Sequence, residues 1–323
     1  MKISEAGEFG LIERLIRIAG KAPGGEIWAG DDCAVVGGPG EEALVTTDLL
    51  VEKVHFDLQL TGPSDLGYKA MAANLSDIAA MGGTAWRAVA ALALRPELDM
   101  AWVEDLFSGM AGCAGQFGCG IIGGDITRGD CLTIAVTALG RAGEAVVFRS
   151  GALPGDAVAV TGTLGASAAG YRLLRAGNRE RSDLLDAHRR PVPRLPEAEA
   201  LVPHRPTAMI DISDGLVADL GHICEASEVG VVVEASALPM VDLSGLGIDR
   251  GALQLALGGG EDYELCFTIA SGRFEAASAA VTAATGTPVS RIGEIVEDTR
   301  GRVLLIEGDE EPLVAPGWDH LRV

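Results

Sequence analysis

The stretch from Asn74 to Gly83, NLSDIAAMGG, places a carboxylate within an apolar helix and ends that helix with two glycines. Apolar residues recur at intervals of three or four positions from Pro63 onward, which predicts a long helix. Asp77 projects from this helix, where a carboxylate loses hydration unless a cation or a hydrogen-bond donor meets it. The stretch alone leaves two interpretations open: a single buried, hydrogen-bonded aspartate, or one member of a site on which other aspartates converge.

The charge balance restricts what such a site can bind. The chain has 323 residues, with 25 Lys and Arg against 46 Asp and Glu, and a formal net charge of −21. This argues against a nucleic acid or an anionic membrane as partner, and metal ions would have to mediate any binding of phosphates. Lysine occurs only at positions 2, 21, 53 and 69, and none of them completes a G-x-x-x-x-G-K-[ST] loop, so a Walker-type phosphate loop is excluded.

The cysteines and the apolar runs bear on where the protein works. The six cysteines form neither a C-x-x-C pair nor a zinc-ligand spacing. We expect reduced, buried thiols. The N-terminus lacks the apolar core of a signal peptide, and no apolar run approaches membrane-spanning length. We therefore predict a cytoplasmic protein with no membrane partner.

The chain is long enough for two domains, and its 48% apolar content with 4% aromatic residues predicts aliphatic cores. The first half alternates strands and helices without the regular repeat of a doubly wound sheet, which indicates an α+β layer. The pattern breaks around residues 143–155, so we predict domains at 1–150 and 151–323. The charged, Arg-rich segment 178–194 is predicted to be a solvated excursion.

Two early segments offer carboxylates at turns and strand ends. The turn GDD contains Asp31 and Asp32, whose charges repel each other unless a cation lies between them, although an ordinary exposed turn is the alternative. The strand ALVTT ends in Asp48 and carries Thr46 and Thr47. Hydroxyl and carboxylate oxygens are hard ligands of the kind that Mg²⁺ prefers.

Two later segments repeat this arrangement. Asp125 follows Gly124 at the end of a buried strand, and Asp211 lies on another apolar strand. Ser213 or Asp214 can cap the following helix, whose free N–H groups would face an anion. The alternative for this turn is an ordinary aspartate cap with a chance neighbour.

Four other side chains are candidates for ligand contact. Arg149, at the predicted domain junction, can bind a phosphate or nucleotide through its planar guanidinium, although a surface arginine in a linker is the commoner case. His55 follows the strand that carries Asp48. Glu261 lies in the loop GGGEDYE, whose acidic residues suit a cationic ligand or a metal-bound phosphate. Trp318 lies in a terminal Pro-Gly turn and could cover a ring-shaped ligand.

Six aspartates thus stand beside Gly, Thr or Ser at element boundaries: Asp31, Asp48, Asp77, Asp125, Asp211 and Asp214. In a chain without a Walker lysine or a zinc motif, they suggest a carboxylate cage for several hard cations. Such cations would neutralise a polyphosphate that this acidic chain would otherwise repel.

The motifs that contain these residues also resemble a known family. GDDCAVV, TTDLLVEKVHF, NLSDIAAMGG, GGDITRG, DISDGLVADLGHI and GGGEDYELCF, in this order, are similar to those of the thiamine-monophosphate kinases, in the aminoimidazole-ribonucleotide-synthetase-like superfamily. The resemblance runs from Gly30 to Trp318. It implies ATP-dependent phosphorylation of thiamine phosphate in thiamine diphosphate biosynthesis. It further implies a homodimer in which N-terminal strands of two subunits form a barrel, with a C-terminal α/β domain in each.

The resemblance also implies residue roles. The Mg²⁺ ligands would be Asp31, Thr46, Thr47, Asp48, Asp77, Asp125, Asp211 and Asp214. The nucleotide contacts would be Gly124, Asp125, Arg149 and Ser213. The thiamine-phosphate contacts would be His55, Glu261 and Trp318. Among the aspartates, Asp77, Asp125 and Asp214 are expected to be catalytic.

Other functions are less consistent with the sequence. A selenophosphate synthetase would carry a reactive residue in an N-terminal glycine-rich loop, but no cysteine precedes Cys33. The hydrogenase-maturation relative would end in a cysteine, whereas this sequence ends in Leu321-Arg322-Val323. Aminoimidazole-ribonucleotide synthetase matches TTDLLVEKVHF and GGGEDYELCF less well. A catalytically silent metal or nucleotide sensor is an alternative of another class, and the intact set of six aspartates argues against it.

Overall fold

The N-terminal half is built on a five-stranded sheet. In the computed structural model, the described residues are 12, 15–16, 25–28, 30–37, 42–143, 145–246, 248 and 251–314. The sheet has the order β1-β2-β5-β3-β4, with β3 and β4 parallel and the other pairs antiparallel. Its strands are β1 (Ala34–Val36), β2 (Ala43–Val51), β3 (Thr84–Leu94), β4 (Gly120–Arg128) and β5 (Thr133–Arg141). Within one chain this sheet is open, with β1 and β4 at its edges.

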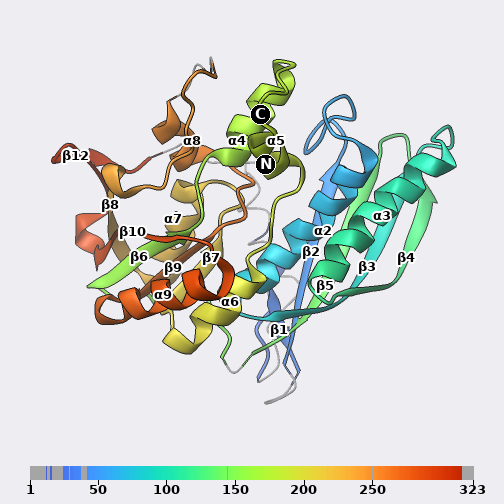
Figure 1. The fold of residues 1–323 in the computed structure, drawn as a ribbon. Coiled ribbons are helices and arrows are strands. Elements are labelled where there is room, and N and C mark those ends of the chain that lie inside the picture. Colours follow the sequence, from blue (N-terminus) through green and yellow to red (C-terminus); the bar gives the residue numbers. More distant parts are fainter. Residues whose placement is uncertain are drawn as a thin grey trace.

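Two long helices, α2 (Pro63–Ala80) and α3 (Met100–Gln116), pack side by side next to this sheet (Figure 1). They approach closely because glycines lie at their crossing. A Cβ at Gly67 would lie 1.9 Å from the backbone oxygen of Leu106, and one at Gly109 would lie 1.9 Å from that of Ser64. Helix α2 is buried along most of its length, because it also contacts elements of the C-terminal half.

The C-terminal half contains a seven-stranded mixed sheet with the order β12-β11-β8-β10-β6-β9-β7. Its strands are β6 (Asp156–Thr161), β7 (Ala208–Asp211), β8 (Val229–Glu234), β9 (Leu265–Ala270), β10 (Val289–Glu297), β11 (Arg302–Ile306) and β12 (Asp309–Pro312). Only the β8–β11 pair is parallel. The predicted two-part α/β fold class is confirmed, and the domain limits at 1–150 and 151–323 stay a prediction.

The helices of this half are α4 (Ala166–Arg175), α5 (Ser182–Arg189), α6 (Leu195–Leu201), α7 (Leu216–Ser227), α8 (Ala252–Gly258) and α9 (Phe274–Thr285), with short 3₁₀ turns at η1 (Val202–His204), η2 (Ala235–Ala237), η3 (Ser271–Arg273) and η4 (Asp298–Arg300). The prediction of a solvated excursion over 178–194 is wrong for its middle. Helix α5 forms there because Leu184, Leu185 and His188 share a buried face.

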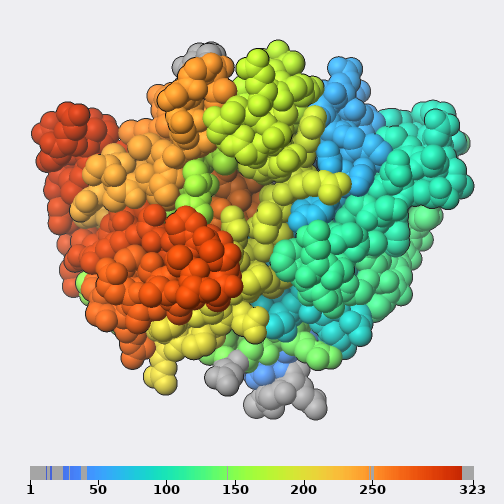
Figure 2. Space-filling model, viewed as in Figure 1, coloured from blue at the N-terminus to red at the C-terminus, as the bar shows by residue number. Residues whose placement is uncertain are grey.

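The hydrophobic core is continuous between the two halves. Alternate residues of β6 face opposite sides of the sheet, as strand geometry requires. Ala157 and Ala159 belong to a core shared with α2, α6 and α9, whereas Val158 and Val160 belong to a second core under α7. Figure 2 shows the segment of α4 and α5, in yellow-green, between α2 and the region of α8. Among the helices of the described residues, none is long and apolar enough to cross a membrane.

Candidate active site

Three carboxylates meet where the two halves join. Oxygen atoms of Asp32, Asp77 and Asp211 all lie within 4.8 Å of one another. Asp32 comes from the turn before β1, Asp77 from α2 and Asp211 from the end of β7. Segments far apart in the sequence therefore build one acidic centre, and Asp77 is a hydrogen-bonded member of this cluster and not a single buried aspartate.

Each member of the cluster has a partner that fixes its orientation. The Thr46 hydroxyl donates to Asp77 Oδ2 at 2.5 Å, and the Ser76 hydroxyl donates to Asp211 Oδ2 at 2.6 Å. Arg149 Nη2 donates to Asp32 Oδ1, also at 2.5 Å. These contacts leave Asp32 Oδ2 buried and without a hydrogen-bond partner among the described residues.

The electrostatics of the cluster favour a bound cation. Burial raises the pKa of Asp211 to about 8, and burial together with the charges of Asp48 and Asp211 raises the pKa of Asp77 well above its ordinary value. The pKa of Asp32 is also raised by burial, although Arg149 opposes this. Like charges in one buried site disfavour ionisation unless a cation compensates them. The hard oxygen donors and the unpartnered Asp32 oxygen fit a divalent cation such as Mg²⁺.

The acidic turn differs from the sequence-based expectation in one respect. Asp31, the predicted ligand, accepts hydrogen bonds from the backbone N–H groups of Asp32 and Arg149, each at 3.0 Å. Its neighbour Asp32 reaches the cluster instead. Burial, followed by the charge of Asp32, raises the pKa of Asp31 to about 6. The sequence could locate the acidic turn but could not tell which of its two carboxylates faces inward.

Strand β2 contributes residues to two faces. Thr46 and Asp48 alternate with Thr47, whose hydroxyl donates to the Val136 carbonyl and lies 3.0 Å from the Thr137 hydroxyl on β5. The side chain of Thr47 therefore points away from the cluster. Asp48 lies on the cluster side, where burial and then the charge of Asp214 raise its pKa to about 6.

The turn after β7 is held from within its own helix. Asp219 Oδ2 accepts hydrogen bonds from the backbone N–H groups of Ser213, Asp214 and Gly215, at 3.0, 3.1 and 3.1 Å. The expected cap by Ser213 or Asp214 is wrong, because Gly215 is the N-cap residue and no side chain caps the helix from that position. These three N–H groups point at Asp219, so they are not free for an anion. The buried Asp219 was not a predicted site residue.

Gly124 and Asp125 lie apart from the cluster within one chain. The prediction that Asp125 lies at the end of a buried strand is wrong, because both residues are exposed within β4, the edge strand of the N-terminal sheet. Two strands separate β4 from β2, so three strand spacings of about 4.8 Å place it roughly 14 Å away. The structure thus does not bring this part of the predicted site together with the other carboxylates.

The predicted substrate contacts are only partly described. His55 lies in the turn after β2, where its Nδ1 accepts a hydrogen bond from the backbone N–H of Val51 at 3.0 Å. Glu261 forms an ion pair with Lys69 at 2.7 Å; burial raises its pKa, but the charge of Lys69 opposes this and the pKa lies below its ordinary value. Trp318 lies outside the described residues. Lys69 was not a predicted site residue, although a lysine in the apolar run YKAMAAN was a signal for it.

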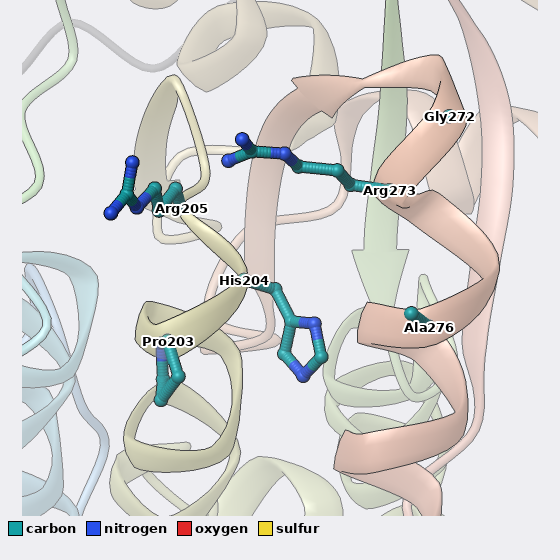
Figure 3. A pocket seen from close by; sticks show the side chains of 6 residues that line it. All are labelled: Pro203, His204, Arg205, Gly272, Arg273 and Ala276. Carbon is teal, nitrogen blue, oxygen red and sulfur yellow. The ribbon is translucent and has the colours of Figure 1, made fainter.

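A separate cavity of about 310 Å³ lies near the start of α9. It is lined by Pro203, His204, Arg205, Gly272, Arg273 and Ala276. Figure 3 shows these side chains coming from the turn around η1 and from the segment that begins α9. None of them belongs to the predicted site or to the carboxylate cluster.

Comparison with known proteins identifies the family. The family model described as AIR synthase related protein, N-terminal domain, matches residues 30–142, and the corresponding C-terminal domain model matches residues 154–306. The thiamine-monophosphate kinase of Escherichia coli (strain K12) is 40% identical, with 97% of this chain and 98% of that protein covered. That of Salmonella typhimurium is 41% identical with the same coverage.

Solved structures agree with this. The structure of AaThiL complexed with AMPPCP and TMP is 32% identical, covers 99% of both chains and has a TM-score of 0.87. The thiamine monophosphate kinase from Aquifex aeolicus is 32% identical, covers 97% of this chain and 100% of that one, and has a TM-score of 0.81. A hydrogenase maturation protein, HypE, in complex with ATP, is 22% identical with a TM-score of 0.72 and shares the fold. From its motifs, its carboxylate cluster and these full-length matches, the chain belongs to the thiamine-monophosphate kinase family of AIR synthase related proteins.

Proposed function

We propose that the protein transfers the γ-phosphoryl group of ATP to thiamine phosphate and so forms thiamine diphosphate. The observation that carries this proposal is the cluster of the buried Asp32 and Asp211 with the partly buried Asp77, which suits divalent cations and hence a metal-bound polyphosphate. Full-length similarity to thiamine-monophosphate kinases supports the choice of substrates.

We propose that this cluster and further oxygen donors hold several Mg²⁺ ions, with Asp125, which lies apart from the cluster within one chain, contributing in the dimer proposed below. The proposed ligands are Asp32 together with Asp31, Thr46, Thr47, Asp48, Asp77, Asp125, Asp211 and Asp214. When bound, Mg²⁺ supplies positive charge that offsets the repulsion between the two anionic substrates. The side chain of Thr47 points elsewhere, so its carbonyl oxygen is the group that it can offer.

The acceptor needs little help from the protein to become a nucleophile. A phosphate monoester has a second pKa of about 6, so at pH 7 it is largely ionised without a general base. The main task of the protein is then to hold the donor and acceptor phosphates in line, because correct positioning lowers the barrier to phosphoryl transfer. Asp77, Asp125 and Asp214 are proposed as the catalytic carboxylates that set this alignment.

We propose that the nucleotide lies against Gly124, Asp125, Arg149 and Ser213, and the thiamine part against His55, Glu261 and Trp318. Burial raises the pKa of Glu261, but the charge of Lys69 and its hydrogen bond oppose this and help to keep the pKa below its ordinary value. Glu261 therefore stays anionic, which suits the positively charged thiamine ring. Arg149, already paired with Asp32, would also hold the acidic turn in place.

A homodimer is part of the proposal. Ile122 and Ile126 on the edge strand β4 are 62% and 68% exposed, and Leu49 on β2 is 54% exposed. Unpaired edge strands with exposed apolar side chains are candidates for association. A second copy that covers β4 would enclose Gly124 and Asp125 and complete a barrel. The six free cysteines support a cytoplasmic location for this enzyme. We also propose domain limits at 1–150 and 151–323.

The test is ADP release from ATP and Mg²⁺ with thiamine phosphate, free thiamine or formylglycinamidine ribonucleotide as acceptor. We expect turnover with thiamine phosphate alone, abolished by EDTA and by Asp77→Asn. Turnover with the ribonucleotide would instead identify a synthetase activity. Binding of ATP without turnover of any acceptor would favour the alternative of a catalytically silent nucleotide sensor.

A further inference from the structure

A buried lysine connects the two halves beside the proposed substrate site. Among the described residues, Lys69 is the only lysine or arginine that is buried, at 3% exposure in α2. Removing an ammonium group from water is costly unless an opposite charge compensates it. Here Glu261 lies 2.7 Å away, on the loop between α8 and β9. The pair therefore spans the junction of the N-terminal and C-terminal halves.

The backbone of Glu261 is fixed relative to the acidic cluster. Glu261 has a φ of 64°, and its N–H donates to the Ser213 carbonyl at 2.7 Å. The N–H of Tyr263 donates to the Ile212 carbonyl at 2.8 Å. A Cβ at Gly260 would lie 2.6 Å from the same Ser213 oxygen, so only glycine allows this approach. The loop is thus attached to the turn that follows Asp211.

The next residue ties the loop to α4. Asp262 accepts hydrogen bonds from the backbone N–H groups of Gly165 at 2.6 Å and Ser167 at 3.0 Å, at the start of that helix. With its backbone held on both sides, Glu261 has only its side-chain orientation left to be determined.

Two groups determine that orientation. Lys69 contacts Oε2 of Glu261, and Nδ1 of His188 lies 3.4 Å from the same oxygen. Burial and the charge of Lys69 lower the pKa of His188 to about 3, so its ring is neutral at pH 7. Both contacts are made to Oε2, while the Glu261 side chain keeps 33% exposure.

Helix α2 sets the distance between this pair and the carboxylate cluster. Lys69 and Asp77 are eight residues apart on one helix, which corresponds to a rise of about 12 Å. Two turns of helix bring residues eight apart back near the same face. Helix α2 thus carries both Lys69, which contacts Glu261, and Asp77, which belongs to the carboxylate cluster.

We propose that Lys69, assisted by His188, is a positioning residue for thiamine phosphate: it holds Oε2 of Glu261 so that the other carboxylate oxygen faces the cationic part of the substrate. This inference rests on the proposed function. Preorganising the carboxylate removes an ordering cost from binding, so its loss weakens acceptor binding more than the chemical step.

The experiment compares Lys69→Met, which keeps length and volume without the charge, with Lys69→Arg, Glu261→Gln and the double variant. Steady-state kinetics give KM for thiamine phosphate, KM for ATP and kcat. For Lys69→Met we expect KM for thiamine phosphate to rise at least tenfold, with KM for ATP and kcat within threefold of the wild type. Lys69→Arg should recover part of the loss. The double variant should be no worse than Glu261→Gln, because the lysine acts through that carboxylate.

Arg190→Met is the matched control, since Arg190, at the end of α5, forms a more exposed ion pair at 2.5 Å with Asp65 of α2, the helix that carries Lys69. It should leave KM for thiamine phosphate unchanged. If Lys69→Met folds and keeps the wild-type KM while its Tm falls, the pair is structural and the inference is overturned. If Lys69→Met does not fold, a KM for the double variant that exceeds that of Glu261→Gln overturns it, and an equal KM supports it. A wild-type protein that is silent with thiamine phosphate overturns both this inference and the proposed function.

Discussion

The Ser76 hydroxyl donates a 2.6 Å hydrogen bond to Asp211 Oδ2 in the buried junction between α2 and β7. One hydrogen bond therefore connects the helix that carries Asp77 to the strand end that carries the second member of the cluster. Because both groups are buried, the carboxylate cannot exchange this donor for water.

Removing this hydroxyl should destabilise the protein. Ser76→Ala leaves Asp211 without its donor, and a buried unsatisfied acceptor costs about 1–3 kcal/mol. We expect the free energy of unfolding in urea to fall by about that amount. Ser108→Ala is the control, since the Ser108 hydroxyl donates to the Glu104 carbonyl on the exposed side of α3. An equal loss in both variants would contradict the argument.

Divalent cations should stabilise the folded protein. The clustered carboxylates Asp32, Asp77 and Asp211 repel one another when ionised. A ligand that binds only the folded state stabilises it by about 2.7 kcal/mol at a hundred times its Kd. We expect Mg²⁺ to raise Tm more than NaCl of equal ionic strength does. Asp77→Asn should lose most of this response, whereas the exposed Asp298→Asn should keep it. Equal responses to the two salts would exclude a specific site.

The loop at 213–215 should depend on Asp219. Asp219→Ala removes the acceptor of three backbone N–H groups, and we expect a loss of at least tenfold in kcat with a lower Tm. Asp219→Asn keeps one acceptor oxygen and should be intermediate. Activity and thermal unfolding of the two variants are the measurements. Wild-type kcat in Asp219→Ala would show that the loop holds its shape without this carboxylate.

Stability should fall in mild acid because of His188. Burial and Lys69 lower its folded pKa to about 3, while an unfolded histidine titrates near 6.5. The neutral, buried His188 therefore leaves the free energy of unfolding unchanged above pH 6.5. This free energy decreases as the pH falls from 6.5 toward the folded pKa of about 3. At pH 5 the loss from this residue is about 2 kcal/mol. Unfolding free energies at pH 7 and pH 5 should differ less in His188→Gln than in the wild type.

The charged groups that act on His188 are Lys69, Glu261 and Arg189, and their charges remain in this variant. The Ser167 hydroxyl and the Tyr171 ring, both on α4, also lie against it and are unchanged. His204→Gln, which changes a histidine of the cavity near α9, is the control and should keep the wild-type difference. The prediction is contradicted if His188→Gln loses as much stability as the wild type between the two pH values.

The edge strand β4 should be needed for assembly. Ile126→Glu places a charge at a position that is 68% exposed in one chain, so it should not unfold the monomer. We expect light scattering to give the mass of a monomer for this variant and of a dimer for the wild type, with activity lost in the variant. Leu153→Glu, at an exposed leucine outside the N-terminal sheet, should stay dimeric. A monomeric wild type would refute the dimer.

The sequence located most of the acidic site but not its finer arrangement. Asp77 and Asp211 were predicted from their apolar surroundings, because a carboxylate in such a place needs a partner. The choice between Asp31 and Asp32 depends on the local turn, which residue types do not determine. Strand alternation could have separated Thr47 from Thr46 in advance, since neighbouring residues of a strand face opposite sides.

Other features depend on contacts that no local pattern contains. Asp219 reaches back to its own helix start, and Lys69 finds its partner 192 positions later in the chain, at Glu261. Helix α5 was missed because arginines dominate its segment, although Leu184 and His188 are four residues apart on one face. The place of Asp125 in the site depends on what covers β4, so a single chain does not decide it.

The junction between α2 and β7 also affects how the chain is made. Asp211 follows Ser76 by 135 residues, and a ribosome adds about 5–20 residues per second. Helix α2 therefore leaves the ribosome roughly 7–27 s before its hydrogen-bond partner exists, and longer before the residue that pairs with Lys69. During that interval its buried face lacks its contacts with α5, α6 and β7. A chaperone would therefore be most useful to this protein while only its N-terminal half has been synthesised.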